Sequence, residues 1–433
     1  MIAVPPHDLA VIQSQTLDEG ISYLRLATEL RRKGLLAESE NAISLALEHI
    51  PDHLEALLLL AYVLAKQGRQ EEADTVIRRA VTHPTAPLGE SLMVAAVDLV
   101  ELLRRQGRSE QADAVMEKIV GLEPENLVMH RQFGMLLLQS GEFKYGWREH
   151  SKRVSHLPQP LWDGGSLAGK TILVQAHQGF GDTIQFVRFL PLLKAQGARV
   201  LLEHQPALHT LLQGAEGWDA LIPRHTGWEV MEWNFDLHIP LMSLPCPLET
   251  EAHLPASVPY LRPDPARVHH WRARLAADPG LKVGLVWAGN PDYKKDKVRS
   301  CRLADYAWLA QLPQVQFYSL QKGQAAEQGR SAPKRMRLID LGPELNDFAD
   351  TAAAIMNLDL VISVDTAVAH LSGALGRPTW TLLPFHACWR WLQEREDSPW
   401  YPTMRLFRQS FPGDWASILQ RLIRELDRFS ARS

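Results

Sequence analysis

The first third of the chain repeats apolar positions with the period of an α-helix. Apolar runs such as LEALLLLAYVLA, residues 54–65, lead to a glycine, and a second helical run then leads to a proline. The glycines are Gly34, Gly68, Gly107 and Gly141, at separations of 34, 39 and 34 residues, and the prolines are Pro51, Pro84, Pro124 and Pro158. This spacing predicts helix–turn–helix repeats of about 34 residues over residues 15–152.

Each recurring residue of this pattern has a physical role. Glycine permits the left-handed backbone that ends the first helix of a pair, and proline ends the second. Ala73 and Ala112 follow their glycines by five residues, and their small side chains let the paired helices approach closely. The pattern resembles the tetratricopeptide repeat, with five extra residues near 85–91. We expect a short α-solenoid whose concave face binds a peptide or protein, with a plain helical bundle as the alternative.

From Thr171 onward, short apolar strands alternate with helices. Residues 153–170, RVSHLPQPLWDGGSLAGK, are rich in Pro and Gly without a period, which predicts a linker. The predicted strands are 172–176, 199–202, 219–222, 236–239, 283–287, 316–320, 338–341, 358–363 and 379–383. Alternating strands and helices predict parallel sheets. We therefore expect two Rossmann-like domains, 171–262 and 280–412, around a cleft, then a C-terminal helix, 413–433.

Composition narrows the class of protein. A chain of 433 residues is too long for one ordinary core, and its formal net charge of -4 argues against a nucleic-acid partner. No apolar run approaches the roughly 18 residues of a membrane span. The cysteines Cys246, Cys301 and Cys388 are odd in number and far apart, which indicates a reducing compartment. We expect a cytoplasmic protein without a transmembrane segment.

The segment QAHQGFGDTIQF, residues 175–186, predicts a strand, a tight turn at Gly179 and Gly181, and a helix opened by Asp182. It is not a dinucleotide fingerprint, because Ile184 stands where the third glycine belongs. One interpretation is that Asp182 caps the helix. The other places its carboxylate at the cleft, where it takes a proton from an acceptor hydroxyl.

The segment VISVDTAVAHLSGALGRPTW, residues 361–380, predicts a buried strand ending at Val364, followed by a turn and a helix. Free N–H groups and the macrodipole make a helix N-terminus attract anions, so a nucleotide diphosphate fits this turn. Asp365 either caps the helix or accepts hydrogen bonds from donor hydroxyls. His370, one turn into the helix, is either a packing residue or part of the same site.

Positive charge gathers in the loop NPDYKKDKVRS, residues 290–300, through Lys294, Lys295, Lys297 and Arg299. The loop SLQKG, residues 319–323, adds Gln321 and Lys322. A charge run is usually a solvated loop. These loops, however, follow strands whose carboxyl ends face the predicted cleft, where cations neutralise a phosphate leaving group.

Three motifs together resemble the bacterial glycosyltransferases related to the lipopolysaccharide heptosyltransferases, which have the GT-B fold. They are QGFGDTIQFVRFLP, SVDTAVAHLSGALGRP and LLPFHACWRWLQEREDSPWYPTMRLFRQ. The resemblance spans residues 171–415 and is strongest to the branch with N-terminal tetratricopeptide repeats. It implies metal-independent transfer of a sugar from a nucleotide-activated donor, without a cofactor, to a hydroxyl on a protein, flagellin for instance, held by the repeats. The alternatives are a non-catalytic repeat scaffold with a degenerate GT-B module, or a transferase acting on lipopolysaccharide or polysaccharide.

The resemblance also implies roles for individual residues. Asp182 matches the catalytic base, and Asp365, Thr366 and His370 match the turn that holds the donor. Either Lys297 or Arg299 would be the phosphate-neutralising cation. Ala367 stands where the heptosyltransferases usually have glycine, and His177, where this branch usually has glutamate, is a candidate for a proton role. The predicted donor-binding residues are therefore Lys297, Arg299, Gln321, Lys322, Asp365, Thr366, Ala367 and His370; the catalytic pair is Asp182 and His177; and the acceptor-side loop comprises Gly179, Gly181 and Gln185.

Overall fold

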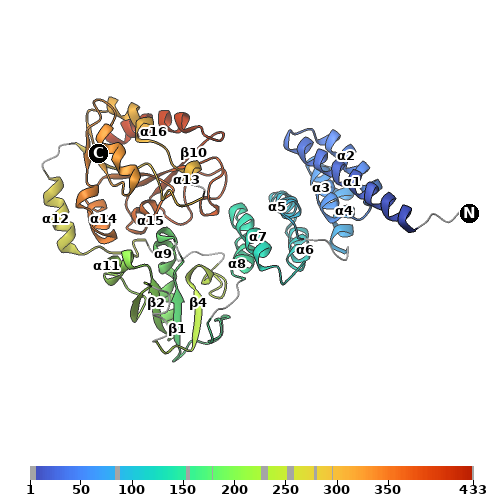
Figure 1. Cartoon of the computed structure of the whole chain (residues 1–433), viewed down its shortest axis with the longest axis horizontal. Helices are drawn as coiled ribbons and strands as arrows, with labels where there is room; N and C mark the ends of the chain where they lie inside the picture. Colours follow the sequence, from blue (N-terminus) through green and yellow to red (C-terminus); the bar gives the residue numbers. More distant parts are fainter. Residues whose placement is uncertain are drawn as a thin grey trace, which may run out of the picture. The chain divides into compact units, whose positions relative to one another are not determined.

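The computed structural model divides the chain into two compact units, Met1–Arg153 and Val154–Ser433 (Figure 1). It describes residues 6–82, 88–152, 157–177, 179–225, 233–250, 258–276, 280–294 and 296–431, with side chains from residue 16 onward. Pro84, Lys295 and part of the predicted insertion near 85–91 lie outside the described residues.

The first unit consists of paired antiparallel helices. The pairs are α1 (Pro6–Arg32) with α2 (Leu36–His49), α3 (Leu54–Lys66) with α4 (Gln70–Thr82), α5 (Glu90–Arg105) with α6 (Ser109–Val120), and α7 (Leu127–Ser140) with α8 (Phe143–His150). A glycine joins the helices of each pair, and all four are left-handed: Gly34, Gly68, Gly107 and Gly141 have φ of 78°, 81°, 73° and 89°. The predicted helix-ending role of these glycines is confirmed, because this backbone region suits glycine.

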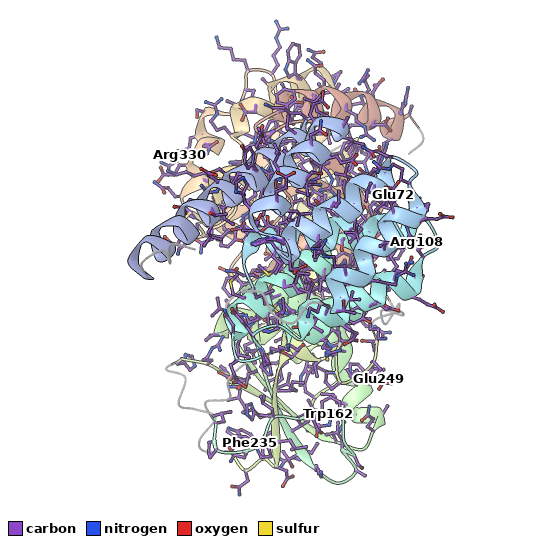
Figure 2. The ribbon with its side chains drawn as sticks, turned by 90° about the vertical axis from the view of Figure 1, so that its right-hand side faces the viewer. Glu72, Arg108, Trp162, Phe235, Glu249 and Arg330 are labelled. Carbon is purple, nitrogen blue, oxygen red and sulfur yellow. The ribbon has the colours of Figure 1, made fainter. Side chains whose placement is uncertain are left out.

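Small side chains let the two helices of a pair pack closely, and ion pairs join successive repeats. Ala73 and Ala112 are fully buried, as the close approach of paired helices requires. Arg108, labelled in Figure 2, pairs with Asp74 of the preceding repeat. One apolar cluster runs from Leu54 to Tyr145, so neighbouring repeats share a continuous core.

The second unit contains two parallel sheets. The four-stranded sheet has the order β3-β2-β1-β4, and its strands are β1 (Thr171–Gln175), β2 (Arg199–His204), β3 (Ala220–Pro223) and β4 (Leu237–Pro240). The six-stranded sheet has the order β10-β9-β8-β5-β6-β7, and its strands are β5 (Leu281–Val286), β6 (Val315–Ser319), β7 (Leu338–Asp340), β8 (Leu360–Val364), β9 (Thr379–Leu383) and β10 (Met404–Arg408). Every strand pairing is parallel, which confirms the expected Rossmann-like architecture.

The helices of the second unit connect these strands. They are α9 (Phe180–Phe186), α10 (Leu190–Ala195), α11 (His209–Gln213), α12 (Pro265–Leu275), α13 (Asp296–Arg299), α14 (Phe348–Ile355), α15 (Ala367–Ala374) and α16 (Trp415–Ser430). The prediction that Asp182 opens the helix after β1 is wrong. The helix begins at Phe180 and is interrupted after Phe186, because Pro191 has no N–H with which to continue the hydrogen-bond ladder.

Each sheet has its own apolar packing. Trp162 and Phe235, both labelled in Figure 2, are buried in the domain of the four-stranded sheet, and the Trp162 indole N–H donates to the Gly165 carbonyl at 2.8 Å. On the six-stranded sheet, α16 buries Ile418 and Leu422, spaced four residues apart as on one helix face. Asp414 caps α16 by accepting from the Ser417 N–H.

The two Rossmann-like domains dock along α9 and α15. Each of these helices follows the carboxyl end of a strand, β1 for α9 and β8 for α15, and the two helices pack against each other. Arg188 donates to the Trp400 carbonyl at 2.9 Å, and the Tyr260 hydroxyl donates to the Ile184 carbonyl at 2.9 Å. The turns that carry the predicted chemistry are therefore neighbours in space.

Candidate active site

The turn before α9 positions Asp182 without using it as a cap. Gly179 is the N-cap residue, and Asp182 lies in the first helical turn. The capping interpretation of Asp182 is therefore wrong. Gly179 is needed for a different reason, because a Cβ there would lie 2.7 Å from Oδ2 of Asp182. The missing side chain leaves room for this carboxylate oxygen.

A buried arginine from the other domain holds the opposite oxygen of the carboxylate. Arg390, in the short helix η8 (Trp389–Trp391), donates from Nη2 to Oδ1 of Asp182 at 2.6 Å. Its Nε donates to Oε1 of Gln185, also at 2.6 Å. The Arg390 side chain is 8% exposed and that of Asp182 is 29% exposed. Asp182 is thus anchored at one oxygen and open to solvent.

The turn after β8 forms the other half of the site. Thr366, rather than Asp365, is the N-cap residue of α15, and it makes no side-chain cap hydrogen bond. Its Oγ1 instead lies 3.0 Å from the Ser363 hydroxyl. The first N–H groups of α15 are therefore not occupied by a capping side chain, which is the arrangement that binds anions at a helix N-terminus.

Burial and charge couple the two turns. Burial is the main cause that raises the pKa of Asp365; the Trp391 side chain and the cations Arg299 and Arg390 oppose this increase, and the Asp182 carboxylate adds the smallest contribution to it. Asp182 and Asp365 are thus near enough for their charges to interact, and the predicted cleft between them stays a prediction. Ala367 takes part in the same contact, because its Cα would lie 3.5 Å from a Cβ on Gly181.

His370 is the buried centre of the second turn. Its Nδ1 lies 3.0 Å from the Tyr401 hydroxyl, its Nε2 lies 3.9 Å from Oδ1 of Asp365, and its ring stacks on Trp391. Burial holds the pKa of His370 well below its ordinary value, and the charges of Arg390 and Arg299 lower it further. His370 is therefore a neutral imidazole at physiological pH, which is not suited to neutralising a phosphate.

The two candidate cations of the basic loop lie in different places. Arg299 donates from Nη1 to the Asp365 carbonyl at 2.9 Å and from Nε to Asp296 at 3.0 Å. Lys297 is exposed and lines a hollow of about 740 Å³, whose lining includes Trp308 and Trp415 but not Arg299. Of the two, Arg299 is the cation that lies beside the turn after β8.

Gln321 and Lys322 hold the ends of strands together. The Gln321 amide accepts from the N–H groups of Trp287 and Ala288 and donates to the Ala288 carbonyl, at 2.9–3.0 Å. The Lys322 ammonium donates to the carbonyls of Gly342 and Leu345. These side chains bind backbone groups of their own domain, and the donor contacts that the sequence predicts for them stay a prediction.

His177 follows β1, near the first turn. Its carbonyl accepts from Nε2 of Gln205 and, at 3.2 Å, from Nη2 of Arg224. Gln205 also donates to the Gly179 carbonyl at 3.2 Å. These contacts fix the backbone on both sides of position 178 and thereby the start of α9. The proton role of His177 stays a prediction.

Sequence reasoning missed Arg390, Trp391 and Tyr401. All three lie within the third motif that carries the family resemblance, but nothing in that motif alone assigns them chemistry. One signal was present. An arginine flanked by Trp389 and Trp391 is placed for burial, and a buried arginine needs a carboxylate or several acceptors.

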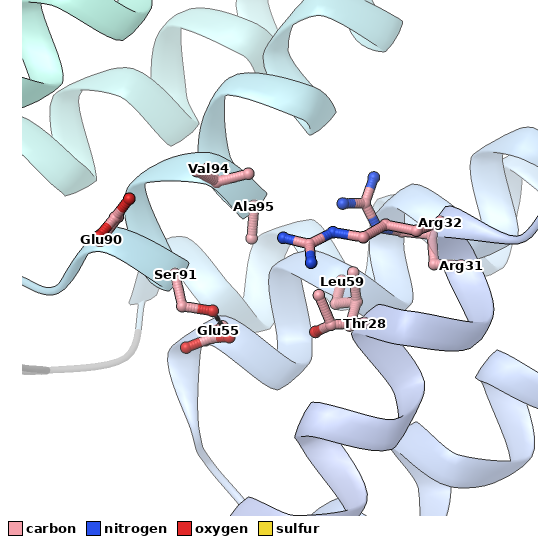
Figure 3. A pocket seen from close by; sticks show the side chains of 9 residues that line it. All are labelled: Thr28, Arg31, Arg32, Glu55, Leu59, Glu90, Ser91, Val94 and Ala95. Atoms are coloured by element: carbon pink, nitrogen blue, oxygen red, sulfur yellow. Dashed lines mark hydrogen bonds between the residues drawn. The ribbon is translucent and has the colours of Figure 1, made fainter. Parts of the chain in front are cut away.

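The first unit carries a second candidate surface, a groove of about 270 Å³ on the first helices of three repeats (Figure 3). Its lining residues are Thr28, Arg31 and Arg32 of α1, Glu55 and Leu59 of α3, and Glu90, Ser91, Val94 and Ala95 of α5. Arg31 is already paired with Asp98 at 2.7 Å, and Glu55 accepts from Ser91. Arg32 and Glu90 are exposed at the groove, so it offers charges of both signs.

Two absences apply to the described part of the chain. Among those residues, no group of three or more His, Cys, Asp or Glu side chains is placed to hold a metal ion. Within the same ranges, no helix is long and apolar enough to cross a membrane.

Comparisons with known proteins agree with this architecture. Residues 307–390 match the glycosyltransferase family 9 (heptosyltransferase) model, and residues 54–82 match a tetratricopeptide repeat model. Protein FlbA of Caulobacter vibrioides is 29% identical over 349 residues, which cover 71% of this chain. The chain spans 56% of the length of that curated relative.

Two glycosyltransferases are among the solved structures whose backbone fold is similar. The family 9 glycosyl transferase of Veillonella parvula is 11% identical, with a TM-score of 0.49 over 63% of this chain and 100% of that one. The ADP-heptose lps heptosyltransferase II of E. coli is 14% identical, with a TM-score of 0.44 over 60% of this chain and 99% of that one.

The paired Rossmann-like domains give the second unit a GT-B type fold, and residues 307–390 within it match the glycosyltransferase family 9 model. With its helical repeats, the chain resembles a tetratricopeptide-repeat-containing glycosyltransferase of the family 9 heptosyltransferase type.

Proposed function

We propose that the chain moves a sugar from a nucleotide-activated donor to a hydroxyl of a protein acceptor, without a metal ion or a cofactor. The observation that carries this proposal is the meeting of two strand-to-helix turns, one with Asp182 and one with Asp365, at the junction of two Rossmann-like domains. Ligands of parallel α/β sheets bind at the carboxyl ends of the strands, where both turns lie.

Each of the two turns carries one part of the reaction. Oδ2 of Asp182 takes the proton of the acceptor hydroxyl while the hydroxyl oxygen attacks the anomeric carbon of the sugar. The bond between that carbon and the diphosphate oxygen breaks. The negative charge that develops on the leaving diphosphate faces the N-terminus of α15 and the guanidinium of Arg299. Asp365 accepts hydrogen bonds from donor hydroxyls.

The repeats supply the acceptor. The groove on α1, α3 and α5 offers Arg32 and Glu90 beside an apolar floor of Leu59 and Ala95. Charges of both signs on a concave repeat surface suit a polypeptide segment better than the uniformly anionic core of a lipopolysaccharide. Flagellin is one candidate acceptor.

A donor screen followed by a transfer assay tests the proposal. UDP, ADP, GDP and CMP are each added to the full chain in a thermal-shift experiment, because a nucleotide that binds only the folded state raises the melting temperature. The matching nucleotide sugar is then used to measure donor hydrolysis and transfer. We expect Asp182→Asn to lower kcat by about 10²- to 10⁴-fold, the usual loss for a general base.

The matched control is Glu344→Gln, which removes a carboxylate that pairs with Arg274 of α12 and makes no contact with Asp182 or Asp365. It is expected to leave kcat within about twofold, as for surface changes. Binding of none of the four nucleotides would contradict the proposal and favour a non-catalytic scaffold. Full activity in Asp182→Asn would remove the proposed base.

A further inference from the structure

Arg390 is a buried cation that reaches from one Rossmann-like domain into the other. It belongs to η8, which follows β9 of the six-stranded sheet, while its carboxylate partner Asp182 lies 208 residues earlier on α9. The guanidinium lies 4.3 Å from the ring centroid of Trp389, and its Nη1 lies 3.1 Å from Sγ of Cys388. These contacts hold the side chain in one orientation before it meets α9.

The guanidinium contacts two residues on one face of α9. Nη2 donates to Asp182 and Nε donates to Gln185, each at 2.6 Å. Residues three apart lie side by side on a helix, so the planar group spans both at once. The rotation of α9 about its axis and the orientation of its carboxylate are therefore set by a residue of the opposite domain.

We infer that Arg390 is a positioning residue for the reaction, an inference that rests on the proposed base function of Asp182. By holding Oδ1, Arg390 directs Oδ2 into the space above Gly179, where a side chain would lie within 2.7 Å of it. Oδ2 accepts no hydrogen bond from any residue that the structure describes. This oxygen takes the proton, and its place is defined only while the two domains are docked.

The charges around the guanidinium fit this role. The Asp182 carboxylate is the ion-pair partner that stabilises the buried guanidinium charge, and the Asp365 carboxylate of the other turn adds a weaker attraction. Arg390 thus couples the docking of the domains to the placement of the base. A small error in placement is costly, since a shift of about 1 Å at a reacting group can lower the rate about 10²-fold.

A double-mutant cycle on kcat tests whether Arg390 acts through Asp182. We expect Arg390→Met to lower kcat about 10²-fold in the wild-type background, with KM for the donor changed much less. In the Asp182→Asn background the same change is expected to lower the residual kcat by less than about threefold, because the group being positioned is already absent. A purely structural role would give the same loss in both backgrounds.

Arg390→Lys is a second test of the inference in case Arg390→Met does not fold. It keeps the charge but cannot span both acceptors, so kcat is expected to fall about tenfold at an almost unchanged melting temperature. The matched control is Arg405→Met, which removes an arginine that pairs with Glu425 and Glu396 within its own domain. We expect it to leave kcat within about threefold.

Hydrogen exchange adds a readout that needs no activity. The amides of α9, in particular Thr183 to Phe186, are expected to exchange about tenfold faster in Arg390→Met and at the wild-type rate in Arg405→Met. Equal kcat losses in both backgrounds with unchanged exchange in α9 would overturn the inference. If the wild type transfers no sugar, the proposed function fails, whereas faster exchange would still support Arg390 as the residue that holds α9.

Discussion

Gly181 of α9 lies against His370 of α15, in the other Rossmann-like domain. A Cβ at Gly181 would lie 2.8 Å from Cδ2 of His370 and 3.5 Å from the Cα of Ala367. Gly181 is helical and does not have a left-handed φ. Glycine is therefore required here by the close approach of two helices, and the tight turn predicted from the sequence is not the reason for it.

Gly181→Ala should separate α9 from α15. The added methyl group cannot be accommodated by a flexible side-chain end, because His370 is buried against Trp391 and Tyr401. We expect the free energy of unfolding to fall by about 1–3 kcal/mol, as for overpacked sites, and kcat/KM to fall by about 10²-fold. Denaturant unfolding and the transfer assay measure the two effects.

Gly329→Ala is the matched control, since a Cβ there meets no atom within 4 Å. It should change the free energy of unfolding by less than about 0.5 kcal/mol. A Gly181→Ala protein as active and stable as Gly329→Ala would mean that the contact between α9 and α15 is loose.

The folded second unit should lose stability as the pH falls below about 6.5. Burial is the main cause that lowers the pKa of His204, His238 and His370 below their ordinary value of 6.5. Below pH 6.5 the unfolded chain therefore binds more protons than the folded one, and the free energy of unfolding decreases. Each histidine adds up to about 1.4 kcal/mol per pH unit to the slope of the free energy of unfolding against pH. This contribution ends when the pH reaches the lowered pKa of that histidine.

Tryptophan fluorescence during urea unfolding at pH 7.5, 6.5 and 5.5 measures this loss. Twelve of the thirteen tryptophans follow residue 160, because only Trp147 precedes it, so the signal reports the second unit. His370→Asn should lower the slope of the free energy of unfolding against pH by the contribution of about one proton. A free energy of unfolding that stays constant between pH 7.5 and 5.5 would contradict the neutral state of these histidines.

Periodicity made most of the fold predictable. The helix pairs and their four glycines follow from local rules, and nine predicted strands appear within one or two residues of their expected bounds. The exception is β10, whose sequence MRLFR contains two arginines and has no clean apolar run. It becomes a strand because β9 offers a neighbouring parallel edge, which is information that a local pattern does not contain.

The candidate site was predictable only in part. Strand ends are visible in a sequence, so the turns with Asp182 and Asp365 were found. Contacts between domains are not visible, since the pair of Asp182 and Arg390 joins residues 208 apart. The same limit explains Gln321, which looked like a rim residue but supports the ends of β5 and β6 through backbone hydrogen bonds.

Arg299 and Lys297 should differ in their effect on donor binding. Arg299 donates to the Asp365 carbonyl in the turn after β8, whereas Lys297 lines a hollow whose lining does not include Arg299. A charge-assisted hydrogen bond contributes about 1.5–3 kcal/mol, so Arg299→Met should raise the Kd of the donor's nucleoside diphosphate by about tenfold or more. Lys297→Met should change it by less than about twofold. Calorimetry on both variants distinguishes the two cations, and the opposite ranking would assign the phosphate to Lys297.

Charge reversal in the groove of the first unit should weaken acceptor use without affecting the donor. Glu90 lies exposed in the first turn of α5, at the groove. If a peptide segment of the acceptor binds there, Glu90→Lys removes one attraction and adds a repulsion, together about 1 kcal/mol or fivefold in KM for the acceptor. Donor hydrolysis in the absence of acceptor should be unchanged.

Glu71→Lys is the matched control, because Glu71 is also exposed and in a first helical turn, but on α4 and outside the groove. Both variants lose the same favourable interaction with a helix dipole, so any difference between them comes from the groove. Equal KM values for the acceptor in the two variants would place acceptor binding on another surface.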